Sequence, residues 1–515
     1  MTQKKQHNVL LILSFIFLCV ISIAGISLAL GYLNTGADRT SILHLAVENE
    51  DVYLPKIQWS SIENPGRPME EQTLKELQKD YLNAWHVRNI AYQQNSSYGI
   101  KDYYTDSVQS NLTKTITYNK QRNISVESTT LFHNPKLNFY STDGQLVVFT
   151  DENVQEHKRI FKNDNVLFET DEYSTYKVMM LLEDGFWKIR HLVKEASGKP
   201  YFENKKSAFA SIKNDSILLN GKKFIIKGIN YYPQKTPWDM FGEHFDPKII
   251  DQDFKLLASL KLNTIRTFVQ YEDFGKASVK KDKLKKLEQV IELAKKNGLK
   301  VIVTLFDFYG NYAVQDWTLT HRHAEQIVSH FKDDQTIIAW DIKNEPDLDF
   351  KNRGKNNVLK WLEYTAKEIR KHDNNHLITI GWSNPIAAEN LHKLVDIVSF
   401  HHFNTNFENE YLKLKSIIPN KPLVVEEFGV SSYRSVWNLF MGYSKKTQAE
   451  YHKKMQGYFL KHNVSHLSWT LYDFKKIPSS VAGKAPWRRN KQKHFGFIDK
   501  NGKKKPSFHF ISTNQ

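Results

Sequence analysis

Short apolar segments alternate with amphipathic helical segments through the C-terminal three-fifths of the chain. The helical pattern is clearest at Leu284–Lys296 and Val358–Lys371, where apolar residues recur at three- and four-residue spacings. Alternation of this kind is typical of parallel strands joined by crossover helices. We therefore predict an α/β fold, a (β/α)8 barrel over residues 215–512, whose eight strands are Ile229–Tyr232, Thr264–Phe268, Val301–Phe306, Ile337–Ile342, Leu377–Ile380, Ile397–Phe400, Leu423–Val425 and Leu467–Leu471.

Residues 69–197 have a different pattern. A helical block begins near Glu70, and strand-like runs follow with turn signals such as Glu183-Asp184-Gly185 between them. Helices followed by an antiparallel meander predict a smaller α+β domain with a curved sheet. The order of elements resembles the cone-shaped nuclear transport factor 2 fold, and Met180–Ile189 resembles its final hairpin. No catalytic constellation stands out here, so we expect a spacer, or a docking module for an envelope protein.

The N-terminal region reads as a membrane anchor. Residues 9–33 are uncharged and mostly apolar, long enough as a helix to cross a bilayer, and Lys4 and Lys5 precede them. A cleaved signal peptide is the alternative, because Ser27-Leu28-Ala29 resembles a cleavage site. We expect residues 1–8 to be a cytoplasmic tail, 9–33 a transmembrane helix and 34–68 a linker, with both folded domains on the extracytoplasmic side. Cys19 is the only cysteine, which excludes an intramolecular disulfide.

The formal net charge of +16 raises the question of a nucleic-acid or anionic-membrane partner. Most lysines, however, are spread among acidic residues in helical segments, which is typical of solvated helix faces. We therefore expect no nucleic-acid partner. The basic run Trp487–His494 is open to two interpretations, a loop flanking a cleft that meets an anionic sugar or a solvated loop.

Polar and aromatic residues collect where the predicted barrel strands end. In a parallel barrel all carboxyl ends lie on one face, and that face carries the active site. Two of these strand-end residues are glutamates, and a pair of carboxyl groups is what glycoside hydrolysis requires. The residues concerned are Arg266, Asp307, Asn344, Glu345, Trp382, His401, His402, Glu427, Trp469, Tyr472 and Asp473.

These phrases resemble glycoside hydrolase family 5. Asn344-Glu345-Pro346 matches that family's motif after strand four, and Glu427-Phe428-Gly429 matches its motif after strand seven. Arg266 matches the arginine after strand two, and Trp469 matches the tryptophan after strand eight. The resemblance implies that Glu345 is the general acid/base and Glu427 the nucleophile, and the other residues expected to contact substrate are Arg266, Asn344, His401, Trp469, Trp382 and Tyr232.

Two positions depart from the family pattern. Phe403 stands where the family usually has a tyrosine that touches the nucleophile, so Tyr232, Tyr472 or another hydroxyl has to substitute, or activity is reduced. Asp307 stands near the end of strand three, where the family often has a histidine. Glu426 is expected to point to the opposite side of its strand from Glu427, because successive side chains alternate.

Three histidines, His321, His323 and His330, lack the spacing of a helical metal motif, so we expect no metal and no other cofactor. The favoured function is retaining hydrolysis of a β-linked glucan or mannan, with carbohydrate as the partner. The alternatives are transglycosylation in envelope or exopolysaccharide assembly and a catalytically silent carbohydrate-binding barrel. The sugar, the linkage and endo or exo cleavage stay open.

Overall fold

The structure is a computed structural model that describes residues 13–26, 53–64, 67–198, 209–433, 444–483 and 485–512. The expected tail 1–8 and most of the expected linker lie outside these residues. Of the predicted membrane span, residues 13–26 are described, and they are helical. No helix in the described part of the chain is both long and apolar enough to cross a bilayer. The membrane anchor therefore stays a prediction.

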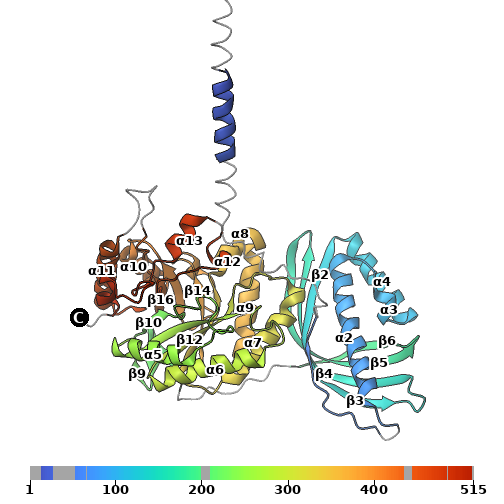
Figure 1. The fold of residues 1–515 in the computed structure, drawn as a ribbon. Coiled ribbons are helices and arrows are strands. Elements are labelled where there is room, and N and C mark those ends of the chain that lie inside the picture. The colour runs from blue at the N-terminus through green and yellow to red at the C-terminus, as the bar shows by residue number, and fades with distance from the viewer. Residues whose placement is uncertain are drawn as a thin grey trace, which may run out of the picture.

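The smaller domain is α+β, as predicted (Figure 1). Its sheet has the order β1-β2-β4-β5-β6, with β3 paired to β4, and every pair except β1–β2 is antiparallel. Helix α2 buries Leu77, Tyr81 and Trp85, which recur every fourth residue, in the core of this domain. Its relation to the nuclear transport factor 2 fold stays a prediction. The elements are β1 (Lys56–Ile57), α2 (Glu71–Gln94), α3 (Ile100–Tyr103), α4 (Asp106–Gln121), β2 (Ile124–His133), β3 (Pro135–Tyr140), β4 (Leu146–Lys162), β5 (Asn165–Glu183) and β6 (Phe186–Gly198).

The second domain is a closed barrel of eight parallel strands in sequential order, which confirms the predicted (β/α)8 architecture. Its strands are almost wholly buried, because helices cover the outside and side chains fill the inside. The strands are β10 (Lys227–Asn230), β11 (Thr264–Gln270), β12 (Lys300–Asp307), β13 (Ile337–Asn344), β14 (Leu377–Trp382), β15 (Val398–His402), β16 (Leu423–Phe428) and β17 (Ser465–Ser468).

The barrel helices differ from the ideal pattern after β14, where the chain forms the short 3-10 helix η4 (Ala387–Glu389) and no α-helix. After β13 the chain forms a 3-10 turn η3 (Pro346–Asp349) and two helices. The α-helices are α5 (Pro247–Ser259), α6 (Lys281–Lys296), α7 (Trp317–Phe331), α8 (Phe350–Arg353), α9 (Lys355–His372), α10 (Phe407–Ile417), α11 (Lys445–His462), α12 (Ser479–Ala482) and α13 (Pro486–Gln492); η2 (Val314–Asp316) and η5 (Pro506–Phe510) are 3-10 helices.

The first and last barrel strands begin earlier than predicted. They pair with each other from Lys227 and His466 onward, which closes the barrel. The predicted end of the last strand leaves the ladder, because Leu471 O instead accepts hydrogen bonds from the backbone N–H groups of Phe497 and Ile498.

A small antiparallel sheet, β7 (Ser211–Lys213), β8 (Ser216–Leu219) and β9 (Lys222–Lys223), precedes the barrel. Its hairpin turns at Asn220 and Gly221, which both have positive φ, as the Asn-Gly sequence predicts. Ile217 packs with Ile302 and Ile338 near the starts of barrel strands. This sheet therefore covers the amino-terminal end of the barrel and leaves the carboxyl end for the site.

The two domains pack against each other through α7 and α9 (Figure 1). The His157 ring of β4 lies 4.6 Å from the Trp317 ring, and Trp317 stacks on Tyr364 at 4.4 Å. Gln155 Nε2 donates to Glu368 Oε1 at 2.9 Å. This interface joins the smaller domain to the helices that flank β13.

Candidate active site

The two predicted catalytic glutamates meet at the carboxyl end of the barrel. Glu345 follows β13, and its backbone is left-handed with φ 46° and ψ 52°. A non-glycine residue in this conformation costs of order 1–3 kcal/mol and persists only where its surroundings hold it. Here the Glu345 amide donates to Gly381 O at 2.6 Å. His401 Nδ1 is hydrogen-bonded to Glu345 Oε1 at 3.0 Å and lies 3.7 Å from Glu427 Oε2, so one nitrogen lies close to both carboxyl groups.

Arg266 lies beneath the site with its side chain fully buried. Its Nη1 donates to Glu427 Oε1 at 2.7 Å, and its Nη2 donates to Asp341 Oδ2 at 2.6 Å and to Asn344 Oδ1 at 2.9 Å. The Asn344 oxygen is therefore occupied by Arg266, which leaves its amide N–H groups for a substrate hydroxyl. Arg266 thus positions the two site residues that the resemblance placed beside it.

Asp341 was missed by sequence reasoning. It is fully buried in β13, and its Oδ2 also accepts from Thr304 Oγ1 at 2.7 Å, while its Oδ1 accepts from the Gly381 amide at 2.9 Å. The signal in the sequence was a carboxylate inside an apolar strand, which buries a charge only when a cation compensates it. Asp341 holds Arg266 in place from the strand that also carries Glu345.

The predicted orientation of the Glu426 side chain was wrong. Glu426 does not turn away from the site, because its Oε1 lies 3.6 Å from Arg266 Nε and its side chain is fully buried. The pairing of β16 with β15 shifts register between Phe400/Val425 and His401/Glu427, which leaves Glu426 unpaired in a bulge. A bulge breaks the strict alternation of side chains. Both neighbouring glutamates therefore reach the same guanidinium.

The charges of these groups are coupled through Arg266 and His401. Burial raises the pKa of Glu427, and His401 and Arg266 oppose that rise. Burial raises the pKa of Glu426 to about 8. Burial lowers the pKa of His401, but the charges of Glu427 and Glu345 outweigh it and raise that pKa above its ordinary value.

A cavity of about 440 Å³ opens above the two glutamates. Tyr232, Asn344 and Trp469, three of the residues expected to contact substrate, line it, and Phe403 lines it at the position of the missing tyrosine. The other lining residues are Trp238, Phe268, Asp307, Phe308, Glu345, Glu427, Val481, Ala482, Arg488, Lys491, Gln492 and Phe495. Aromatic faces around two carboxyl groups form a site suited to a pyranose ring.

Arg266 and His401 were expected to contact substrate, but both are buried and do not line the cavity. Trp382 and Tyr472 also lie differently from what was expected. Trp382 is almost fully buried, at 1% exposure, and does not line the cavity; its ring lies 6.3 Å from that of Phe350. Trp382 was expected to contact substrate, but its ring packs beside Phe350 of α8. Tyr472 does not replace the missing tyrosine, because its hydroxyl donates to Asp253. Of the other groups that could stand in for that tyrosine, Tyr232 lines the same cavity as Glu427, and His401 Nδ1 lies 3.7 Å from Glu427 Oε2.

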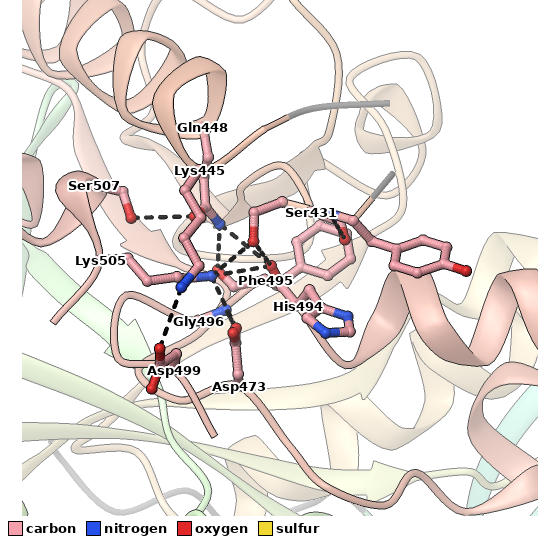
Figure 2. Close-up of polar contacts among 12 residues, drawn as sticks. Ser431, Lys445, Gln448, Asp473, His494, Phe495, Gly496, Asp499, Lys505 and Ser507 are labelled. Atoms are coloured by element: carbon pink, nitrogen blue, oxygen red, sulfur yellow. Dashed lines mark hydrogen bonds and ion pairs between the residues drawn. The ribbon is translucent and has the colours of Figure 1, made fainter. Parts of the chain in front are cut away.

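The basic run forms part of the cavity wall. Helix α13 carries Arg488 and Lys491 to the cavity, and Ser431 Oγ donates to Lys491 O at 2.6 Å. Buried Lys505 anchors the following segment: its Nζ donates to Asp473 Oδ1 at 2.9 Å and to His494 O at 3.2 Å, as Figure 2 shows. Trp238 and Phe495 had no clear motif, and only the fold brings them to the cavity.

Comparison with known proteins identifies the barrel. Residues 219–475 match the family model described as Cellulase (glycosyl hydrolase family 5). Human beta-glucuronidase is 23% identical over 307 residues, which cover 53% of this chain and 42% of that protein. The tomato (Solanum lycopersicum) mannan endo-1,4-beta-mannosidase 5 is 23% identical over 305 residues, which cover 44% of this chain and 71% of that protein.

Among solved structures, the exo-beta-1,4-mannosidase Op5Man5 from an Opitutaceae bacterium is 18% identical with a TM-score of 0.47, and the alignment covers 60% of this chain and 61% of that one. The chain spans less than half the length of the beta-glucuronidases that it matches. The family model covers the strands from β10 to β17 and includes Glu345, Glu426 and Glu427. The barrel of this chain is therefore of the glycoside hydrolase family 5 type.

Proposed function

We propose that the barrel hydrolyses a β-linked glycan with retention of configuration, with Glu427 as nucleophile and Glu345 as general acid/base. The observation that carries the proposal is that a single atom, His401 Nδ1, lies close to both carboxyl groups, 3.0 Å from Glu345 Oε1 and 3.7 Å from Glu427 Oε2. Retaining enzymes need carboxyl groups about 5–5.5 Å apart, against about 6.5–9.5 Å in inverting enzymes. One atom close to both carboxyl groups favours the shorter separation.

The surroundings suit these two roles. Glu427 accepts a charge-assisted hydrogen bond from Arg266, which favours the ionised form needed for attack on the anomeric carbon. Glu345 is the more exposed of the two, and it faces a cavity in which a leaving oxygen can take its proton. In the second step Glu345 accepts a proton from water, which attacks the anomeric carbon and releases Glu427. Asn344 would bind the 2-hydroxyl of the sugar, where contacts strengthen in the transition state.

The test is covalent trapping with 2-fluoro glycosides, followed by peptide mass analysis of the full chain. We expect an adduct on Glu427, and a loss of turnover of about 10³-fold or more in Glu427→Gln and Glu345→Gln. Glu389→Gln is the matched control, because Glu389 is an exposed carboxyl group on the same barrel. We expect this variant to keep its turnover. Absence of any adduct across several sugars would favour the silent carbohydrate-binding barrel. An adduct that transfers to a sugar acceptor faster than to water would favour the transglycosylase.

We also propose that the substrate carries an acidic sugar. Arg488 and Lys491 line the same cavity as the two glutamates, and a cation there attracts a sugar carboxylate. The relatives include beta-glucuronidases as well as mannan endo-1,4-beta-mannosidases, so both acidic and neutral sugars have to be tested. We expect Lys491→Gln to lower kcat/KM at least 10-fold for an aryl β-glucuronide, with little change for an aryl β-mannoside. Preference of the unchanged protein for the neutral sugar would overturn this part and leave the assignment of the glutamates intact.

We propose that residues 9–33 hold the chain in a membrane, with both domains on the extracytoplasmic side. The support is the uncharged sequence, and the large apolar side chains of the described helix, such as Phe15 and Phe17, are exposed. A surface of that kind suits lipid. Membrane fractionation with alkaline carbonate extraction tests it: release of the full chain into the soluble fraction would contradict an integral anchor.

A further inference from the structure

Three potential metal ligands meet on the face of the barrel that packs against the smaller domain. His321 comes from α7, and Glu368 and His372 come from α9, one helical turn apart. One ligand atom from each lies within 4.8 Å of the other two. None of the three lines the cavity above the catalytic glutamates, so this cluster is separate from the active site.

The spacing of the two imidazoles suits a tetrahedral ion. His321 Nε2 and His372 Nε2 are 3.4 Å apart, within hydrogen-bond distance of each other, and a bound ion would replace that hydrogen bond. Zinc–nitrogen bonds of about 2.0–2.1 Å at a tetrahedral angle place two nitrogens about 3.3–3.4 Å from each other. The nitrogens therefore already stand at the distance that one zinc ion would require.

Glu368 has one oxygen available. Its Oε1 accepts from Gln155 at 2.9 Å and from Lys371 at 2.5 Å, whereas its Oε2 is buried and accepts no hydrogen bond. A buried carboxylate oxygen without a partner is costly, and a bound cation would satisfy it. This second observation is independent of the imidazole spacing.

The electrostatics select the kind of ion. Two of the three ligands are imidazoles, and imidazole nitrogen is a ligand that ions of the zinc class prefer. Lys371 contacts Glu368, and Lys56 and Arg322 contact the neighbouring Glu325, so little negative charge remains to attract a hard cation. Such a site favours ions that prefer nitrogen ligands over ions that prefer oxygen.

We propose that His321, His372 and Glu368 bind a divalent ion of the zinc class and that this ion ties α7 to α9 beside the smaller domain. Gln155 from β4 holds the third ligand, so the ion would stabilise the surface on which that domain docks. The residue spacing in the sequence does not indicate this site, because its ligands come from two helices and not from one helical motif.

The experiment uses the full chain, purified without a histidine tag and stripped with a chelator. Zinc chloride alone is then titrated by calorimetry, and bound metal is counted by elemental analysis. We expect one ion per chain and a rise in Tm of at least about 2 °C on zinc addition. His372→Gln and Glu368→Gln should abolish both effects.

His330→Gln is the matched control, since His330 lies on α7 with its side chain largely in solvent and pairs with Glu288. We expect this variant to bind zinc as the unchanged chain does. Equal zinc binding by His372→Gln, or no stoichiometric binding by the unchanged chain, would overturn the proposal. Because His372 is partly exposed, we expect the His372→Gln variant to fold. Circular dichroism of the same preparation checks this.

Discussion

The two adjacent glutamates of β16, Glu426 and Glu427, contact the Arg266 guanidinium differently. Glu427 is hydrogen-bonded to Arg266, whereas Glu426 lies 3.6 Å from its Nε and accepts no hydrogen bond. Burial raises the pKa of Glu426 to about 8. The charges of Asp341 and Glu427 add to this rise, and those of Arg266 and His401 oppose it. Glu426 is therefore protonated near neutral pH and leaves the charge of Arg266 to Asp341 and Glu427.

This protonation state predicts the pH dependence of Glu426→Gln. A carboxyl whose pKa rises from 4.5 to about 8 on folding binds more protons in the folded chain, so its contribution to stability is lost as pH rises through that window. The slope is up to about 1.4 kcal/mol per pH unit. Glutamine keeps the neutral form at every pH. We expect the variant to gain at least about 1 kcal/mol relative to the unchanged chain between pH 5 and pH 8.

The measurement for Glu426→Gln is urea unfolding of both proteins at the two pH values. An identical difference at pH 5 and pH 8 would mean that Glu426 titrates in the folded chain as it does in the unfolded one.

At the scale of elements, the wall of the cavity depends on segments that follow β17. Lys505 is buried, and its Nζ contacts Asp473, Ser432 and His494, which join the segment after β17, the one after β16 and the one after α13 (Figure 2). A second lysine in the same view, Lys445, pairs with Asp499 at the surface. The two lysines therefore differ in burial more than in chemistry.

This difference predicts unequal costs. Lys505→Met would leave Asp473 buried without its cation, and breaking a buried pair typically costs about 3–5 kcal/mol. Lys445→Ala should change the free energy of unfolding by about 0–1 kcal/mol, because exposed pairs contribute little. Urea unfolding of the two variants checks the contrast. Equal destabilisation by both would contradict a structural role for the buried pair.

At the scale of the molecule, the two domains are joined by aromatic and polar contacts rather than by the connecting segment alone. His157 packs on Trp317 and Tyr364, and Gln155 donates to the buried Glu368. Aromatic pairs add about 0.5–1.5 kcal/mol, and hydrogen bonds to charged groups about 1.5–3 kcal/mol. The domains should therefore unfold together.

The corresponding prediction concerns a Gln155→Ala/His157→Ala double variant. We expect its differential scanning calorimetry trace to split into two transitions, because each domain then loses the stabilisation that the other supplies. His191→Ala, on the exposed part of β6, is the control and should keep one transition. A single unchanged transition in the double variant would show that other contacts couple the domains.

Periodicity alone determined the eight parallel strands, the α+β domain before them and the strand-end positions of Glu345 and Glu427, whereas Arg266 lies inside β11 and not at its end. Burial of apolar side chains imposes a local repeat on each strand and helix, and such a repeat is visible without coordinates. Strand ends in a parallel barrel share one face, so a linear sequence was enough to bring the two glutamates together.

Only the tertiary structure decided which neighbours complete the site. Glu426 reaches Arg266 because of a bulge, and the position of Trp382 depends on Phe350 of α8. Trp238, Arg488 and Lys491 reach the cavity on long connections. The pairing of His321 with Glu368 and His372 likewise depends on two helices packing side by side. These contacts join residues far apart in the chain, and no local repeat encodes them, because they follow from how the elements pack.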